Sequence, residues 1–158
     1  MSDTVRELYG KKLRVRACGL CVLDESLLLI NHSSLSVGDF WAPPGGGVEF
    51  GEEAATCIKR EFEEETGLKV EVGAFLFACE FIKVPLHAVE LFFKVNWVGG
   101  NLASGYDPEV GPAHQIIKEA RFITWRQVSE MDPDQLHGIF NFTPNPSQIM
   151  ELRGYFKV

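Results

Sequence analysis

The sequence contains no long apolar run and comparatively few basic residues. None of its apolar stretches approaches the ~20 residues that a membrane-spanning helix needs. Residues 1–10 lack the apolar core of a secretion signal. The 15 lysines and arginines stand against 22 aspartates and glutamates, for a formal net charge of −7, which argues against sequence-independent binding to nucleic acid. We therefore expect a cytoplasmic protein that binds neither membranes nor nucleic acid.

Cysteine is also scarce, with four residues of which Cys18 and Cys21 form one CxxC pair. Residues three apart in a strand point to opposite faces, and no second CxxC pair is present, so the sequence favours buried free thiols. A zinc site or a redox role for this pair is the alternative. With 158 residues, 46% of them hydrophobic, and no internal repeat, the chain is expected to form one domain over residues 1–158.

Residue periodicity predicts a mixture of strands and helices. Strand patterns cover residues 12–23, 27–30, 69–83, 86–98 and 116–125. Helical patterns cover residues 53–66, 125–131 and 132–140, and a last helical turn is expected at 148–153. The alternating basic residues Lys12, Arg14 and Arg16 are either candidates for binding a terminal phosphate or the mark of an edge strand, where such residues discourage aggregation. This mixture fits an α/β fold in the form of a three-layer α/β/α sandwich.

The helix predicted over residues 53–66 carries an unusual set of carboxylates. Glu61, Glu64 and Glu65 stand at positions i, i+3 and i+4, so they converge on one face and repel one another. They also lie in the last turn before Gly67, where the negative end of the helix dipole disfavours anions. A hard divalent cation such as Mg²⁺ would relieve both effects. A solvated acidic face is the alternative interpretation.

The same segment matches a known pattern at every defined position. It reads Gly46-x5-Glu52-x7-Arg60-Glu61-Phe62-x-Glu64-Glu65-x-Gly67-Leu68, which resembles the Nudix box. Resemblance to the Nudix hydrolase family implies an α/β/α sandwich with a mixed β-sheet. It also implies an Mg²⁺-dependent pyrophosphohydrolase, with Mn²⁺ able to substitute. Such an enzyme cleaves the diphosphate of a nucleoside diphosphate linked to another group, as in a nucleoside triphosphate, ADP-ribose or a related nucleotide sugar.

The resemblance also assigns roles within the box. Glu61, Glu64 and Glu65 would be the metal ligands, and Glu64 and Glu65 would also take part in catalysis. Arg60, which is always cationic, would orient a carboxylate. Glu52 and Gly46 would support the helix and shape the loop. Family members recruit the general base from the box or from a later segment, where Glu119 and Glu109 are the candidates; each could instead be an ordinary exposed acid.

Substrate contacts are predicted outside the box. The aromatic residues Phe40, Trp41 and Tyr106 are placed to stack on a base, with core packing as the alternative for Trp41. Arg14 is a candidate for binding a terminal phosphate. Tyr106 belongs to a glycine-rich stretch, residues 99–115, which we expect to influence specificity.

Two other functions remain open from the sequence. One is a Nudix domain that senses or binds a ligand without turnover, although such domains usually lose box carboxylates and this chain keeps them. The other is processing of RNA ends or caps, for which the acidic composition is unfavourable. The expected partner is a small nucleotide, and formation of a homodimer through the N-terminal strand is left open.

Overall fold

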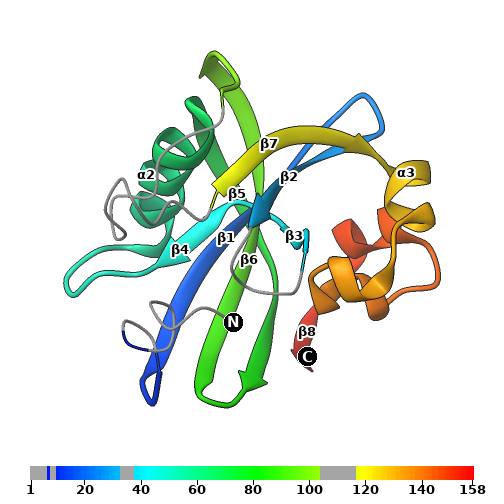
Figure 1. Cartoon of the computed structure of the whole chain (residues 1–158). Helices are drawn as coiled ribbons and strands as arrows, with labels where there is room; N and C mark the ends of the chain where they lie inside the picture. Colours follow the sequence, from blue (N-terminus) through cyan, green and yellow to red (C-terminus); the bar gives the residue numbers. More distant parts are fainter. Residues whose placement is uncertain (1–6, 8–9, 33–37, 104–116) are drawn as a thin grey trace.

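The computed structural model describes residues 7, 10–32, 38–103 and 117–158. Figure 1 shows a strongly twisted sheet with helical segments on either side of it. The strands are β1 (Leu13–Leu23), β2 (Ser26–His32), β3 (Trp41–Ala42), β4 (Gly45–Gly47), β5 (Leu68–Lys83), β6 (Leu86–Gly100), β7 (Ile117–Thr124) and β8 (Gly154–Lys157). The helices are α2 (Ala54–Thr66) and α3 (Trp125–Glu130), with 3-10 helices η2 (Pro133–Gln135), η3 (Gly138–Asn141) and η4 (Pro146–Glu151).

Strand β1 lies in the interior of the sheet, so the alternative of an edge strand is wrong. The strand order is β3-β2-β1-β6-β5-β8, while β4 pairs with β1 and β7 pairs with β2. The β1–β6 and β5–β8 pairs are parallel and the others antiparallel, which makes the sheet mixed. The basic side chains of β1 therefore belong to a covered strand, where a buried cation needs a partner.

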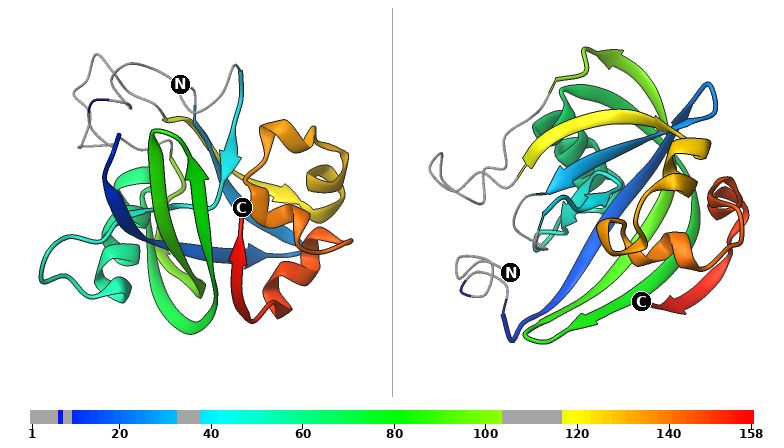
Figure 2. Two further views of the ribbon diagram at one scale, coloured as in Figure 1. Left: turned by 90° about the horizontal axis from the view of Figure 1, so that it is seen from below. Right: turned by 45° about the vertical axis from the view of Figure 1, so that its right-hand side comes forward.

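The two faces of β1 contribute to two different hydrophobic cores. Ala17 and Cys21 pack in a core that contains residues of α2, whereas Cys18 and Leu20 belong to a core that includes residues of α3, η3 and η4. Alternation along the strand thus divides its side chains between two layers, as a strand period of two requires. Both views in Figure 2 show the sheet between α2 and the C-terminal helical segments. The predicted α/β sandwich with a mixed sheet is confirmed.

Helix α2 begins and ends almost where the sequence predicts. Ile58 and Phe62 are fully buried on its apolar side. Gly67 follows the helix in the left-handed conformation, with φ 73°, and its N–H donates to the carbonyl oxygen of Glu63. Glycine adopts this conformation without the steric cost of a Cβ atom, so it ends the helix there. The last turn, which carries the carboxylates, is therefore held at a fixed position against the sheet.

The C-terminal third departs from the sequence prediction. Instead of one helix over residues 132–140, two 3-10 helices form, η2 and η3. His137 between them has an extended ψ of 138°, and its imidazole Nδ1 accepts a hydrogen bond from the N–H of Ile139, which starts η3 anew. The last helical turn is the 3-10 helix η4, and β8, which the sequence pattern does not indicate, adds to the edge of β5. In the described ranges, no helix is long and apolar enough to span a membrane.

Candidate functional site

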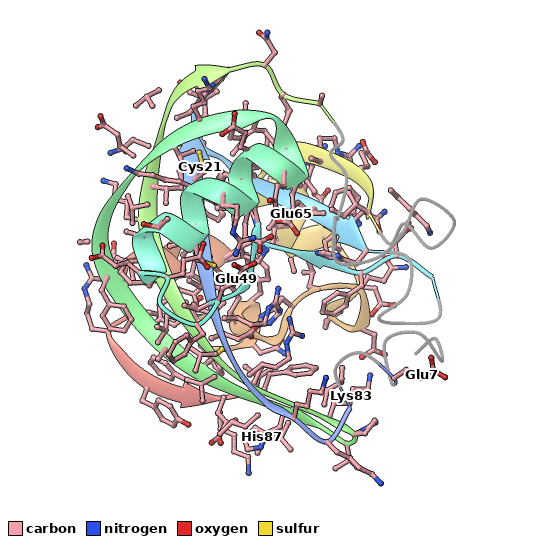
Figure 3. The ribbon with its side chains drawn as sticks, turned by 90° about the vertical axis from the view of Figure 1, so that its left-hand side faces the viewer. Glu7, Cys21, Glu49, Glu65, Lys83 and His87 are labelled. Carbon is pink, nitrogen blue, oxygen red and sulfur yellow. The ribbon has the colours of Figure 1, made fainter. Side chains whose placement is uncertain are left out.

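The carboxylates of α2 do not form a solvated face. The residues Glu61 and Glu65 are only 7% and 5% exposed, and Glu64 is half-buried. In Figure 3, Glu65 and Cys21 appear on either side of the α2 ribbon, and Glu49 marks the loop before the helix. Burying a carboxylate is costly unless a cation or hydrogen bonds compensate it. Two buried carboxylates one turn apart therefore point to a site built for positive charge.

Arg60 supplies part of that charge in this structure. Its Nη1 atom lies 2.7 Å from Oε1 of Glu61 and 3.3 Å from Oε2 of Glu64. One guanidinium nitrogen thus contacts both carboxylates, which shows that Glu61 and Glu64 reach a common point. The other side of the guanidinium contacts Glu52, through Nε at 2.9 Å and Nη2 at 3.0 Å. Arg60 therefore ties the start of the helix to its carboxylate face.

Glu52 is fixed at the entrance to α2. Besides its two contacts with Arg60, its Oε2 atom accepts a hydrogen bond from the N–H of Glu49 at 3.0 Å. These contacts, those with Arg60 foremost, lower the pKa of Glu52. The side chain of Glu53, the residue that precedes the helix, makes no capping bond, so Glu52 is the acid that organises this turn.

The glycines of β4 lie against the carboxylates. The N–H of Gly45 donates to Oε2 of Glu65 at 2.9 Å. A Cβ atom placed on Gly46 would overlap the carboxyl group of Glu61, and one on Gly45 would overlap the backbone of Ala17 and Cys18. Gly46 therefore allows α2 to approach β4 this closely, and Gly45 allows β4 to pack against β1. The first glycine of the box thus makes room for one of its acids.

These residues suit a hard metal ion because their donors are carboxylate oxygens and because several negative charges lie close together. Burial raises the pKa of Glu61, and Arg60 only partly opposes this, so a further cation nearby would stabilise the charged carboxylate. Among the described residues, no three His, Cys, Asp or Glu side chains are already arranged to hold a metal. The fit therefore rests on two observations. Glu61 and Glu65 are buried against Gly46 and Gly45, and Glu64 shares the Nη1 atom of Arg60 with Glu61. Oxygen donors of this kind suit Mg²⁺ or Mn²⁺.

A second charged cluster lies next to the glycine strand, and sequence reasoning did not find it as a cluster. Arg16 Nη1 lies 2.7 Å from Glu90 Oε1, and Glu90 Oε2 lies 2.8 Å from Nε2 of His137. Glu90 and His137 are 2% and 5% exposed, respectively. The three residues come from β1, β6 and the η2–η3 turn, so only the folded chain brings them together. A signal in the sequence was the acidic residue Glu90 between the apolar residues Val89 and Leu91 of the strand pattern.

The predicted residues outside the box are spread over the molecule. Trp41 is buried in the core with the guanidinium of Arg121 over its ring, which gives it a packing role. Phe40 is half-buried, with its ring 6.3 Å from that of His137. Arg14 is half-buried on β1, and Glu119 is half-exposed on β7, 3.7 Å from Nε of Arg121. Tyr106 and Glu109 lie outside the described residues.

Comparison with proteins of known sequence and structure places this arrangement in context. An ADP-ribose pyrophosphatase of Methanocaldococcus jannaschii is 32% identical over 91 residues, 56% of this chain and 54% of that protein. An m7GpppN-mRNA hydrolase of Xenopus laevis is 38% identical over 72 residues, 42% of this chain and 23% of that protein. The chain thus spans about half or less of these relatives. A crystal structure of a UDP-X diphosphatase superposes with a TM-score of 0.68 at 21% identity, covering 92% of this chain and 67% of that one.

The family assignment rests on a longer match than either of the two sequence relatives gives. Residues 12–145 match the NUDIX domain, from the first residues before β1 to the segment before η4. That range contains β1 to β7, α2 and α3, and so includes the glycine strand against which Glu61 and Glu65 are buried. The chain therefore belongs to the NUDIX family.

Proposed function

We propose that this protein is an Mg²⁺-dependent pyrophosphohydrolase that cleaves the diphosphate of a nucleoside diphosphate linked to a further group. The observation that carries the proposal is the burial of Glu61 and Glu65 against the glycines of β4, with Glu64 and Glu61 sharing one nitrogen of Arg60. Family membership adds to it, because the complete box is present. A purely structural helix would not need to bury acids of like charge in its last turn.

In this proposal Glu61, Glu64 and Glu65 hold the metal ion. When bound, Mg²⁺ would neutralise charge on the diphosphate and lower the pKa of a water molecule, so that a general base can take its proton as the water oxygen attacks phosphorus. Arg60 keeps Glu61 and Glu64 oriented, and Glu52 holds Arg60. The Gly45 N–H occupies one lone pair of Glu65 and thereby sets the direction of its carboxylate. The general base is a box glutamate or Glu119, whose carboxylate is half-exposed on β7.

The substrate class is proposed from two sources. The relatives named above are an ADP-ribose pyrophosphatase, an m7GpppN-mRNA hydrolase and a UDP-X diphosphatase. The substrates in these three names are all nucleotides that contain a phosphoric anhydride, which is the substrate class that the box predicts. We therefore propose a nucleoside triphosphate, ADP-ribose or a nucleotide sugar, bound with the help of Phe40 and Arg14. Residues 99–115, including Tyr106, remain the segment predicted to set specificity.

A substrate panel tests the proposal directly. It should contain nucleoside triphosphates, ADP-ribose, nucleotide sugars, dinucleoside polyphosphates, CoA and m7G-capped RNA, each with Mg²⁺ and with Mn²⁺. We expect metal-dependent hydrolysis of at least one small nucleotide, and product identification shows which anhydride bond breaks. Binding of a nucleotide without hydrolysis under any metal condition would instead support a sensing domain. Preferential cleavage of capped RNA would support the second alternative.

A further inference from the structure

Arg16 connects two parts of the molecule that lie on different elements. Its side chain is 22% exposed, and its guanidinium donates from Nη1 to Glu90 Oε1 at 2.7 Å and from Nη2 to the carbonyl oxygen of Gly45 at 2.9 Å. The first contact joins register partners of the parallel β1–β6 pair. The second reaches the glycine strand β4. A single cation thus bridges an interior acid and the backbone next to the box carboxylates.

The Glu90 end of this bridge is rigidly held. Glu90 Oε2 contacts Nε2 of His137 at 2.8 Å, and the thiol of Cys79 lies 3.6 Å from the same oxygen. Burial alone would raise the pKa of Glu90, but the neighbouring His137 and Arg16 outweigh it and lower this pKa to about 2. Glu90 is therefore a permanent anion at neutral pH. A charge fixed from two sides fixes the guanidinium that pairs with it.

The Gly45 end of the bridge leads to the proposed metal ligands. The carbonyl of Gly45 accepts from Arg16, and the N–H of the same residue donates to Oε2 of Glu65 at 2.9 Å. Gly45 is packed closely against β1, where an added Cβ atom would overlap Ala17 and Cys18. The position of this one residue therefore sets where the Glu65 carboxylate is held. A continuous line of contacts runs from His137 through Glu90, Arg16 and Gly45 to Glu65.

We propose that Arg16 is a positioning residue for the metal centre, acting through the backbone of Gly45 on the carboxylate of Glu65. The inference rests on the proposed function, since it assumes that Glu65 binds metal. Groups that orient a metal ligand through hydrogen bonds commonly change metal affinity or activity on the order of 10- to 100-fold when removed. Arg16 is one step further from the metal, so a loss near the lower end of that range is expected.

The competing interpretation is that Arg16 and Glu90 only fasten β1 to β6. Breaking one half of a buried ion pair destabilises a protein, whereas replacing both charges together avoids an unpaired charge. The informative variant is therefore Arg16→Met combined with Glu90→Gln, which keeps a polar partner for His137 and removes the contact with Gly45. Arg16→Lys retains the charge but not the two-armed geometry. Glu90→Gln alone retains the Arg16–Gly45 contact. Arg126→Met changes an 86% exposed arginine and is the matched control.

Each variant is titrated with Mn²⁺, and electron paramagnetic resonance measures how much of the metal is bound. The values of kcat and KM are then measured for the best panel substrate. Circular dichroism and thermal melting show whether each variant is folded. We expect the double variant to bind Mn²⁺ about 10-fold more weakly. Its kcat should fall more than its KM changes. Arg16→Lys should recover part of the loss, Glu90→Gln alone should lose less than the double variant, and the control should match the wild type.

Two results would overturn the inference in distinguishable ways. A folded double variant with wild-type Mn²⁺ affinity and kcat would leave Arg16 as a fastener of strands, while the proposed function stands. If the double variant does not fold, Arg16→Lys decides the question, because lysine cannot contact Glu90 and Gly45 with two separate arms. Wild-type Mn²⁺ affinity and kcat in that folded variant would show that the two-armed contact does not position the metal centre. Wild-type protein that neither binds Mn²⁺ nor hydrolyses any substrate would overturn the proposed function as well.

Discussion

Gly46 and Glu61 lie so close that there is no room for a methyl group between the glycine Cα and the glutamate carboxyl group. A Cβ atom on Gly46 would overlap the carboxyl group of Glu61, although these residues are far apart in the sequence. The glycine is therefore required by the side chain opposite it, and positive φ is not the reason, since Gly46 is outside the set of glycines with positive φ.

Gly46→Ala should displace the Glu61 carboxylate and weaken metal binding while the fold is retained. We expect Mn²⁺ affinity to fall by about 10-fold or more, because a metal ligand is moved from its place. Gly99→Ala is the control, since its Cβ would make only an ordinary contact, 3.8 Å from Cβ of Lys69. Equal Mn²⁺ affinity in the two variants, measured by titration, would contradict this role for Gly46.

Glu64→Gln and Glu65→Gln should each remove most turnover without unfolding the protein. Each change removes a charge that the proposed metal needs, and a loss of at least about 100-fold in kcat is expected, comparable with removal of one transition-state contact. Melting temperature without metal should stay the same or rise, because carboxylate repulsion decreases. Glu63→Gln, on the exposed side of the same helix, is the matched control. Near-wild-type kcat at saturating Mg²⁺ in either variant would rule out its proposed role.

Mg²⁺ and Mn²⁺ should stabilise the wild-type protein. A ligand that binds only the folded state adds about 2.7 kcal/mol at a concentration 100 times its Kd, which differential scanning fluorimetry detects as a rise in melting temperature. Ca²⁺ is expected to bind without supporting turnover. The combined variant Glu64→Gln with Glu65→Gln should show a much smaller shift. A wild-type melting temperature that no millimolar cation changes would speak against the metal site.

His32 should make the fold sensitive to mild acid. Burial, reinforced by the charges of Arg16 and His137, lowers the pKa of His32 to about 3 from an ordinary value of 6.5. Below pH 6.5 the unfolded chain takes up a proton that the folded chain refuses, so this contribution to stability is present above that pH and is lost as pH falls towards 3. The slope in this window is about 1.4 kcal/mol per pH unit.

Denaturant unfolding at pH 7 and pH 5 measures this effect. The wild type should lose about 2 kcal/mol more between these two pH values than His32→Gln does. His87→Gln, which changes a half-exposed histidine on β6, is the comparison variant for loss of a histidine elsewhere on the sheet. Identical pH dependence in wild type and His32→Gln would show that another group controls acid stability.

The box could be predicted from the sequence because its information is local. Residue spacing along one helix determines that Glu61, Glu64 and Glu65 share a face, and Gly67 ends that helix in any context. The Arg16–Glu90–His137 contacts could not be predicted in this way, because they depend on β1 lying between its neighbours and on where the C-terminal 3-10 helices dock. The alternative of an edge strand would have placed Arg16 on the surface, whereas the structure places it between Glu90 and Gly45.

The C-terminal segment shows the same limit on a smaller scale. Asp132 and Pro133 give a genuine helix start, and the Asp132 side chain does accept from the N–H of Asp134. What stops the helix is tertiary: the N–H of His137 donates to the carbonyl oxygen of Trp41, and Gly138 lies against Val158. Contacts with residues so distant in sequence override a local helix signal.

The free thiols offer a means of watching the two layers separately. Cys18 and Cys79 are buried in the core beneath α3 and the 3-10 helices, while Cys21 and Cys57 are buried in the core beneath α2. Burial raises the pKa of all four, to about 11 for Cys21 and about 12 for Cys57. An alkylating reagent can therefore modify each thiol only when its own layer opens. Labelling rates resolved by peptide mass would report which side of the sheet loosens first.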